Sequence, residues 1–193
     1  MLAAAPATTA QDDLRAARTR GSPTAPVTIF EMSDFQCPFC AQFVRETMPA
    51  IEREYVATGK VKLVFVNFPL PMHPNAEPAA ELAMCAARQE RFWAVHDLLF
   101  RHQAEWEGLR EPATFFLALG DSAGADREQI VACLRSGATR ELVRADAEGS
   151  ARSGATGTPS FYVEGGIMRG MIPIRVFRQV LDSIVRVKTA SRP

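Results

Sequence analysis

The sequence has no excess of charge of either sign and few tryptophans and tyrosines. Lysine and arginine together number 22, as do aspartate and glutamate, so the formal net charge is zero. A nucleic-acid-binding surface normally shows as a basic excess, and the two tryptophans and two tyrosines are too dispersed to form a platform for stacked bases. We therefore expect no nucleic-acid partner.

Long hydrophobic runs are also missing. No stretch approaches the roughly 18 apolar residues that a membrane-spanning helix needs. The N-terminus lacks the basic start and the apolar core of a signal peptide, although its small residues up to Ala10 resemble the end of one. A disordered tail rich in alanine and threonine fits these residues equally well, and we expect residues 1–24 to be a flexible tail.

Cysteine and histidine are scarce, and their spacing argues against a metal site. The four cysteines lie at positions 37, 40, 85 and 133, and the three histidines at 73, 96 and 102. A zinc site would need a second Cys-x-x-Cys, or cysteines and histidines at ligand spacing, so we expect no metal. In an oxidising compartment four cysteines could form two disulfides, whereas in the cytosol a single Cys-x-x-Cys would be the redox unit.

The most informative feature that the sequence does contain is the pair Cys37 and Cys40. The apolar run 27–32 predicts a strand just before the pair, and a helical pattern begins at Cys37. Free backbone N–H groups and the helix dipole at such a junction favour a thiolate over a thiol. Half of a metal site and simple packing are the alternatives for this pair, and the surroundings favour a redox site.

The order of the predicted elements indicates an α/β chain. The strand 27–32, a helix that Pro49 should kink or divide, and the strand 61–68 form a βαβ unit. After a long helical stretch, the strands 160–163 and 167–170 form a predicted hairpin before the last helix.

The helical stretch divides the α/β unit into two halves and therefore indicates an inserted domain. We expect one domain from residues 25–74 and 155–188, an inserted helical domain from 75–154, and a C-terminal tail from 189–193.

This βαβ…ββα layout resembles the thioredoxin fold, and the helical insertion makes it similar to DsbA-like proteins. The resemblance covers roughly residues 22–187 and rests on the order and spacing of four motifs. They are the segments 35–40, 73–76, 92–100 and 157–161. A protein of this kind is a thiol–disulfide oxidoreductase that needs neither an organic cofactor nor a metal.

The resemblance assigns a role to each residue of the Cys-Pro-Phe-Cys motif. Cys37 is the nucleophile that forms a mixed disulfide with a partner protein, and Cys40 resolves that disulfide. Pro38 stiffens the turn, while the backbone N–H groups of Phe39 and Cys40 can donate to the Cys37 sulfur. Strongly oxidising members often carry histidine where this chain has Phe39, which argues against extreme oxidising strength.

Three further residues match functional positions of the family. Pro159 matches the cis-proline that lies opposite the two cysteines, and Thr158 before it could tune the Cys37 sulfur. An ordinary trans proline that opens a strand is the alternative. Glu31 matches a buried carboxylate that relays protons to the second cysteine, and its alternative is a strand-end carboxylate that reaches solvent.

Some family members carry a second, structural disulfide in the helical domain, which implies pairing of Cys85 with Cys133. The alternative is two buried free thiols. We expect a monomeric, periplasmic or otherwise extracytoplasmic oxidase that acts on cysteine-containing polypeptides and is reoxidised by a membrane-bound, quinone-linked partner. A reductase or isomerase with the same site, and a thioredoxin-like module that only binds proteins, are the alternatives.

Overall fold

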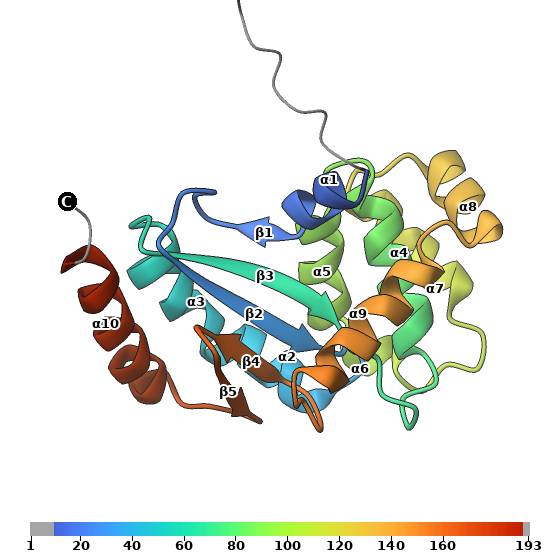
Figure 1. Cartoon of the computed structure of the whole chain (residues 1–193). Coiled ribbons are helices and arrows are strands. Elements are labelled where there is room, and N and C mark those ends of the chain that lie inside the picture. The colour runs from blue at the N-terminus through green and yellow to red at the C-terminus, as the bar shows by residue number, and fades with distance from the viewer. Residues whose placement is uncertain (1–9, 191–193) are drawn as a thin grey trace, which may run out of the picture.

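The structure is a computed structural model that describes residues 10–190, with side chains described from residue 13 onward (Figure 1). The predictions for residues 1–9 and 191–193 lie outside the described residues. Within the described range the elements follow the order expected from the sequence, with one helix and one short strand added in front.

Five strands form a single sheet at the centre of the chain. Their bounds are β1 Thr19–Arg20, β2 Val27–Ser33, β3 Val61–Asn67, β4 Ser160–Val163 and β5 Gly166–Arg169. The strand order is β1-β3-β2-β4-β5, in which only β2 and β3 run parallel. Glu31 in β2 pairs with Phe65 of β3 on one side and with Phe161 of β4 on the other. The parallel pairing of β2 with β3 and the antiparallel pairing of β4 with β5 confirm the predicted βαβ unit and hairpin.

The predicted helix after Cys37 is divided, as Pro49 indicated. α2 (Pro38–Glu46) ends before Thr47, and α3 (Met48–Ile51) and the π-helical turn η1 (Glu52–Val56) follow it. Pro49 has no N–H group with which to continue the hydrogen-bond ladder of α2, so a new helix begins beside it.

Six helices occupy the stretch between β3 and β4. Their bounds are α4 Ala76–Ala87, α5 Phe92–Arg101, α6 Gln103–Trp106, α7 Ala113–Ser122, α8 Arg127–Ser136 and α9 Arg140–Arg152. Figure 1 shows these helices at one end of the molecule and α10 (Ile174–Ala190) at the other, with the sheet between them.

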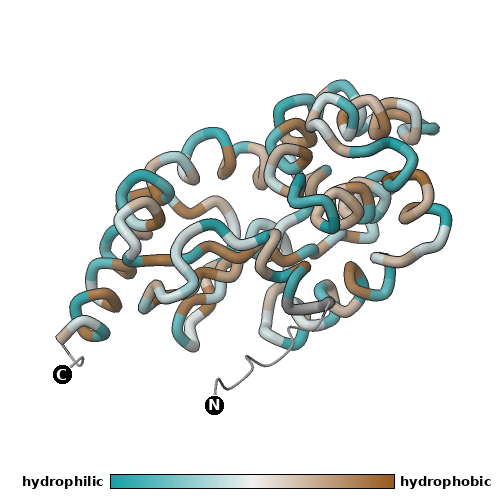
Figure 2. The backbone as a smooth tube through the Cα atoms, turned by 90° about the horizontal axis from the view of Figure 1, so that it is seen from above, coloured by the Kyte–Doolittle hydropathy of each residue, from teal (hydrophilic) through white to brown (hydrophobic). Residues whose placement is uncertain are grey.

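Two buried apolar clusters hold these parts together. One cluster joins the helical stretch to Phe65 of β3 and to both Cys37 and Cys40. The other lies between the strands, the α2–η1 segment and α10. The strands through the middle of Figure 2 are accordingly mostly hydrophobic, whereas hydrophobic and hydrophilic residues alternate along the helices around them. The limits of a separate helical domain at residues 75 and 154 stay a prediction.

The predicted tails are wrong where the structure can be compared. Residues 10–20 form α1 (Ala10–Ala17) and β1, and Leu14 is buried in the core. The edge of β3 supplies ladder hydrogen bonds to β1, and Arg18 makes an ion pair with Asp146 of α9. At the other end, α10 continues to Ala190, into the predicted C-terminal tail.

Candidate active site

Cys37 and Cys40 lie at the start of α2. Cys37 is the residue just before the helix, with extended backbone angles (φ −73°, ψ 123°), and Pro38 is the first helical residue. The backbone N–H groups of Cys40 and Ala41 donate to the Cys37 carbonyl oxygen at 3.1 and 3.2 Å. Both cysteines are buried free thiols, so the structure shows the reduced form of the pair.

The two thiols differ strongly in acidity. The hydrogen bond from the Cys40 thiol lowers the pKa of Cys37 from 9.0 to about 6, against the opposing effect of burial. Thr158 and the backbone N–H groups of Cys40 and Phe39 add smaller effects that also lower it. Burial raises the pKa of Cys40 well above its ordinary value of 9.0. At neutral pH the pair therefore carries its thiolate on Cys37.

The loop before β4 faces the Cys37 sulfur. The Thr158–Pro159 peptide bond is cis, as the resemblance implied. The Cys37 sulfur lies 3.4 Å from the Thr158 carbonyl oxygen, to which it donates only while it is protonated. Two hydrogen bonds hold the loop: the Gly170 N–H group donates to the Pro159 carbonyl at 2.7 Å, and the Ser160 hydroxyl to the Gly157 carbonyl at 2.7 Å.

The turn between the cysteines presents apolar side chains to solvent. Pro38 is exposed, and Phe39 is 57% exposed although it is a large apolar residue. Cys37 and Cys40 on either side are almost completely buried. The reactive sulfur is therefore reached past an apolar rim rather than past a charged one.

Glu31 lies inside the molecule, in the central strand β2. It is fully buried, which excludes the alternative of a strand-end carboxylate in solvent. Among the described residues, neither carboxyl oxygen has a partner in hydrogen-bonding geometry. Burial raises the pKa of Glu31 from 4.5 to about 8, while the nearby Ser33 hydroxyl and the Arg20 charge act in the opposite direction. Glu31 is therefore protonated at neutral pH.

The turn between β2 and α2 is held by Asp34, a residue to which the sequence reasoning assigned no role. Its Oδ1 atom accepts a hydrogen bond from the Gln36 N–H group at 2.7 Å. Its Oδ2 atom accepts from the Leu70 N–H group at 2.8 Å and lies 2.7 Å from His73 Nδ1. His73 thus shapes the loop before α4 by contacting Asp34 rather than a cysteine.

Two glutamines continue this network. Gln36 Oε1 accepts from the Asn75 N–H group at 2.7 Å, at the start of α4. Gln103 Nε2 donates to the carbonyl oxygens of Phe35 at 2.7 Å and Cys37 at 3.1 Å. The helical stretch therefore fixes the backbone on which the reactive cysteine stands.

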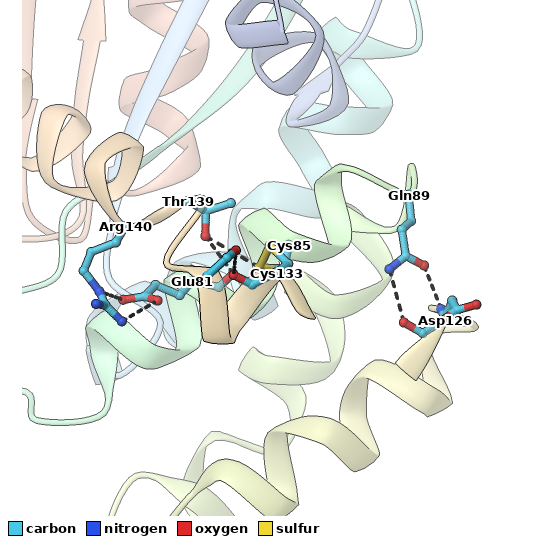
Figure 3. The surroundings of a disulfide bond; sticks show 8 residues. Glu81, Cys85, Gln89, Asp126, Cys133, Thr139 and Arg140 are labelled. Atoms are coloured by element: carbon cyan, nitrogen blue, oxygen red, sulfur yellow. Dashed lines mark hydrogen bonds and ion pairs between the residues drawn. A yellow bond between two sulfur atoms is a disulfide. The ribbon is translucent and has the colours of Figure 1, made fainter. Parts of the chain in front are cut away.

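Cys85 of α4 and Cys133 of α8 form a disulfide, which confirms the predicted pairing. Figure 3 shows the bond with Thr139 beside it and the Glu81–Arg140 ion pair close by. In the part of the chain that the structure describes, no three histidine, cysteine or acidic side chains gather so that they could hold a metal ion. In that same part, no helix has the length and apolarity to cross a membrane.

The sequence model of the family described as Thioredoxin matches residues 14–183. The chain belongs to the thioredoxin family. Within it the chain is DsbA-like, and this confirms the resemblance seen in the sequence. The probable disulfide bond formation protein D of Bacillus anthracis is 31% identical over 152 residues, which are 76% of this chain and 69% of that protein.

One further relative and two solved structures are similar to this chain over different shares of their length. The Na(+)/H(+) antiporter NhaA 3 of Salinispora tropica is 38% identical over 147 residues, but the chain spans only 21% of that protein's length. Alpha-DsbA1 of Wolbachia pipientis has a TM-score of 0.80 at 21% identity, with 90% of this chain and 92% of that chain covered. Oxidised BdbD of Bacillus subtilis gives 0.79 at 22% identity, with 88% and 92% covered. These two structures show the same fold.

Proposed function

We propose that this DsbA-like chain is a thiol–disulfide oxidoreductase that forms disulfides in cysteine-containing polypeptides outside the cytoplasm. The observation that carries the proposal is the position of Cys37, at the start of α2 and opposite the cis Thr158–Pro159 bond, with a lowered pKa beside the buried Cys40. A thiolate that is stable at neutral pH makes the reduced form of the pair favourable, and a pair with a favourable reduced form is an oxidant.

The first step uses the oxidised pair. A substrate thiolate attacks the Cys37 sulfur, a new S–S bond forms between substrate and Cys37, and the Cys37–Cys40 bond breaks. Cys40 leaves as a thiolate and takes a proton, because its pKa lies well above 9.0. Glu31, protonated below a pKa of about 8, is the buried acid that supplies this proton.

The second step releases the product. A second thiolate of the substrate attacks the substrate sulfur of the mixed disulfide, and Cys37 leaves. Since the pKa of Cys37 is about 6, it leaves as a stable thiolate without needing a proton at neutral pH. Two electrons have then passed from the substrate to the pair, and a membrane-bound, quinone-linked partner takes them away.

Two features of the chain support further parts of the proposal. The exposed Phe39 and Pro38 offer an apolar rim to an unfolded polypeptide. The Cys85–Cys133 bond is of a kind that persists in oxidising compartments, which supports a periplasmic or other extracytoplasmic location. We propose a monomer as the working form.

The proposal is tested with a peptide that carries two cysteines. We expect the oxidised protein to convert it to the disulfide form and Cys37→Ser to be inactive. Wild type that binds the peptide without any thiol exchange would mean a protein-binding module instead. Reduction of insulin without oxidation of the peptide would mean a reductase.

A further inference from the structure

His96 of α5 is a fully buried histidine with one partnered and one unpartnered ring nitrogen. Its Nδ1 atom lies 2.7 Å from Asp97 Oδ1. Its Nε2 atom is buried and has no protein partner among the described residues. Aromatic rings surround it at centroid distances between 4.9 and 6.1 Å: Phe35, Phe65, Phe92, Trp93 and Phe100. Such a polar atom in an apolar cage is costly unless it has a use.

The sheet places Glu31 next to the same aromatic cage. Glu31 and Phe65 are paired positions of the parallel strands β2 and β3, so their side chains lie side by side on one face. The Phe65 ring lies 5.3 Å from the His96 ring. Ser33 follows on that face of β2, and its buried hydroxyl also lacks a protein partner among the described residues. Buried polar atoms of this kind are where folded proteins bind ordered water.

The other side of His96 opens to solvent. The Asp97 side chain is 45% exposed and is held by Arg20 Nη2 through contacts of 3.0 and 3.1 Å. Arg20 also pairs with Glu52 and lies 4.0 Å above the Trp93 ring. Arg20, Glu52 and Asp97 border a cleft of about 390 Å³ that is also lined by Ala41, Met48 and Phe100. The cleft therefore opens beside the later turns of α2 rather than at Cys37.

We infer that His96 is a positioning residue for proton transfer. It links Glu31 to solvent at Asp97 along a path that is separate from the face that the substrate covers. The inference rests on the proposed function, in which Glu31 gives its proton to Cys40. The imidazole takes a proton at one ring nitrogen and releases one at the other, so no net charge stays in the core. Besides burial, the charges of Arg20 and Glu52 affect the pKa of both Glu31 and His96. Asp97 also affects the pKa of His96, and the Ser33 hydroxyl that of Glu31.

The pH dependence of Cys40 protonation distinguishes this role from a merely structural one. Below a pKa of about 8 Glu31 already holds a proton, so the first step needs no delivery from solvent. Above this pKa, Glu31 is deprotonated in most molecules and must first take up a proton from solvent. With the path intact, this proton uptake is fast and the reaction has one phase. With the path broken, the protonated molecules react fast and the others slowly.

The experiment follows tryptophan fluorescence after the oxidised protein is mixed with the two-cysteine peptide, from pH 6 to pH 9.5. We expect one phase for wild type, and for His96→Phe a slow second phase whose amplitude grows as the pH rises through about 8. His102→Phe is the matched control, since His102 has a similar partner, Glu105 at 2.6 Å, but is partly exposed. Glu31→Gln removes the carboxyl group that takes up the proton, so this variant should show no such pH-dependent phase.

Asp97→Asn keeps the ring in its cage and should show the same slow phase, so the inference is tested even where His96→Phe fails to fold. A single phase at every pH for Asp97→Asn, or for a folded His96→Phe, overturns the inference. Wild type that forms no mixed disulfide at any pH overturns the proposed function instead.

Discussion

The Sγ atom of Cys37 lies 3.4 Å from the carbonyl oxygen of Thr158, although 121 positions separate the two residues in the chain. β2 and β4 are antiparallel neighbours in the sheet, so the start of α2 and the loop before β4 meet at the same end of these two strands. A polypeptide that reacts with Cys37 therefore meets the backbone of this loop at the same time.

The two cysteines should give different results when each is replaced. Cys40→Ser leaves the Cys37 thiolate but removes the group that resolves a mixed disulfide, so a stable covalent adduct with a cysteine peptide should accumulate. Cys37→Ser should give none, because the remaining thiol is buried with a raised pKa. Mass spectrometry of the two variants after reaction with an activated peptide disulfide checks this. Adducts on Cys40 would contradict the assignment of the nucleophile.

The reduced protein should become more stable relative to the oxidised one as the pH rises. The pKa of Cys37 falls from 9.0 to about 6 on folding, so between these values the unfolded chain binds more protons. This stabilisation of the folded, reduced protein is fully present above pH 9.0 and is lost as the pH falls through about 6. Urea unfolding of both forms at pH 5 and pH 8 measures the difference. A difference that is constant or smaller at pH 8 contradicts the lowered pKa.

Glu31→Gln should remove a pH dependence of the opposite sign. The pKa of Glu31 rises from 4.5 to about 8 on folding, so the folded form binds more protons between these values. The free energy of unfolding of oxidised wild type should therefore contain a contribution that is lost as the pH rises toward 8. The glutamine variant should show a flatter profile, and an unchanged slope would show that Glu31 ionises normally.

The Cys85–Cys133 bond should contribute to stability without setting the chemistry. It closes a loop with a sequence separation of 48, for which chain entropy gives about 4 kcal/mol. The double variant Cys85→Ala/Cys133→Ala should lose stability of that order in urea unfolding. The ultraviolet titration of the Cys37 thiolate should keep its midpoint. A shifted midpoint would show that the bond also tunes the active site.

Asp34 should be far more important for stability than its place in a turn implies. Asp34→Ala leaves the Gln36 and Leu70 N–H groups and His73 without their acceptor, and we expect a loss of about 3 kcal/mol. The matched control is Asp121→Ala, which breaks only the exposed ion pair with Arg127 and should cost well under about 1 kcal/mol. Equal losses in urea unfolding would contradict this role of Asp34.

Local signals were sufficient to predict the elements and the reactive pair. The strand before Cys37, the break at Pro49 and the hairpin before α10 all depend on residues close together in sequence. β1 was missed because its strand conformation comes from pairing with β3, about 40 residues away, and not from its own two residues. The same reason explains why α1 was read as part of a tail, since its core contacts, made by Leu14 and Ala17 among the described side chains, are with residues distant in sequence.

The polar surroundings of the site were harder to predict. Asp34 lies next to the motif, but its partners Leu70 and His73 are 36 and 39 positions away, so only the folded chain shows what it does. His96 is a second residue whose surroundings the sequence does not show. It is buried, but one nitrogen has no protein partner among the described residues, and no periodicity in the sequence reveals this.

The equilibrium reduction potential of the Cys37–Cys40 pair against glutathione tests the central claim most directly. The lowered pKa of Cys37 stabilises the reduced pair, so we predict an oxidising potential nearer to about −120 mV than to about −270 mV. Phe39 in place of a histidine should keep the value from the oxidising extreme. A potential near about −270 mV would contradict the account and make the protein a reductase.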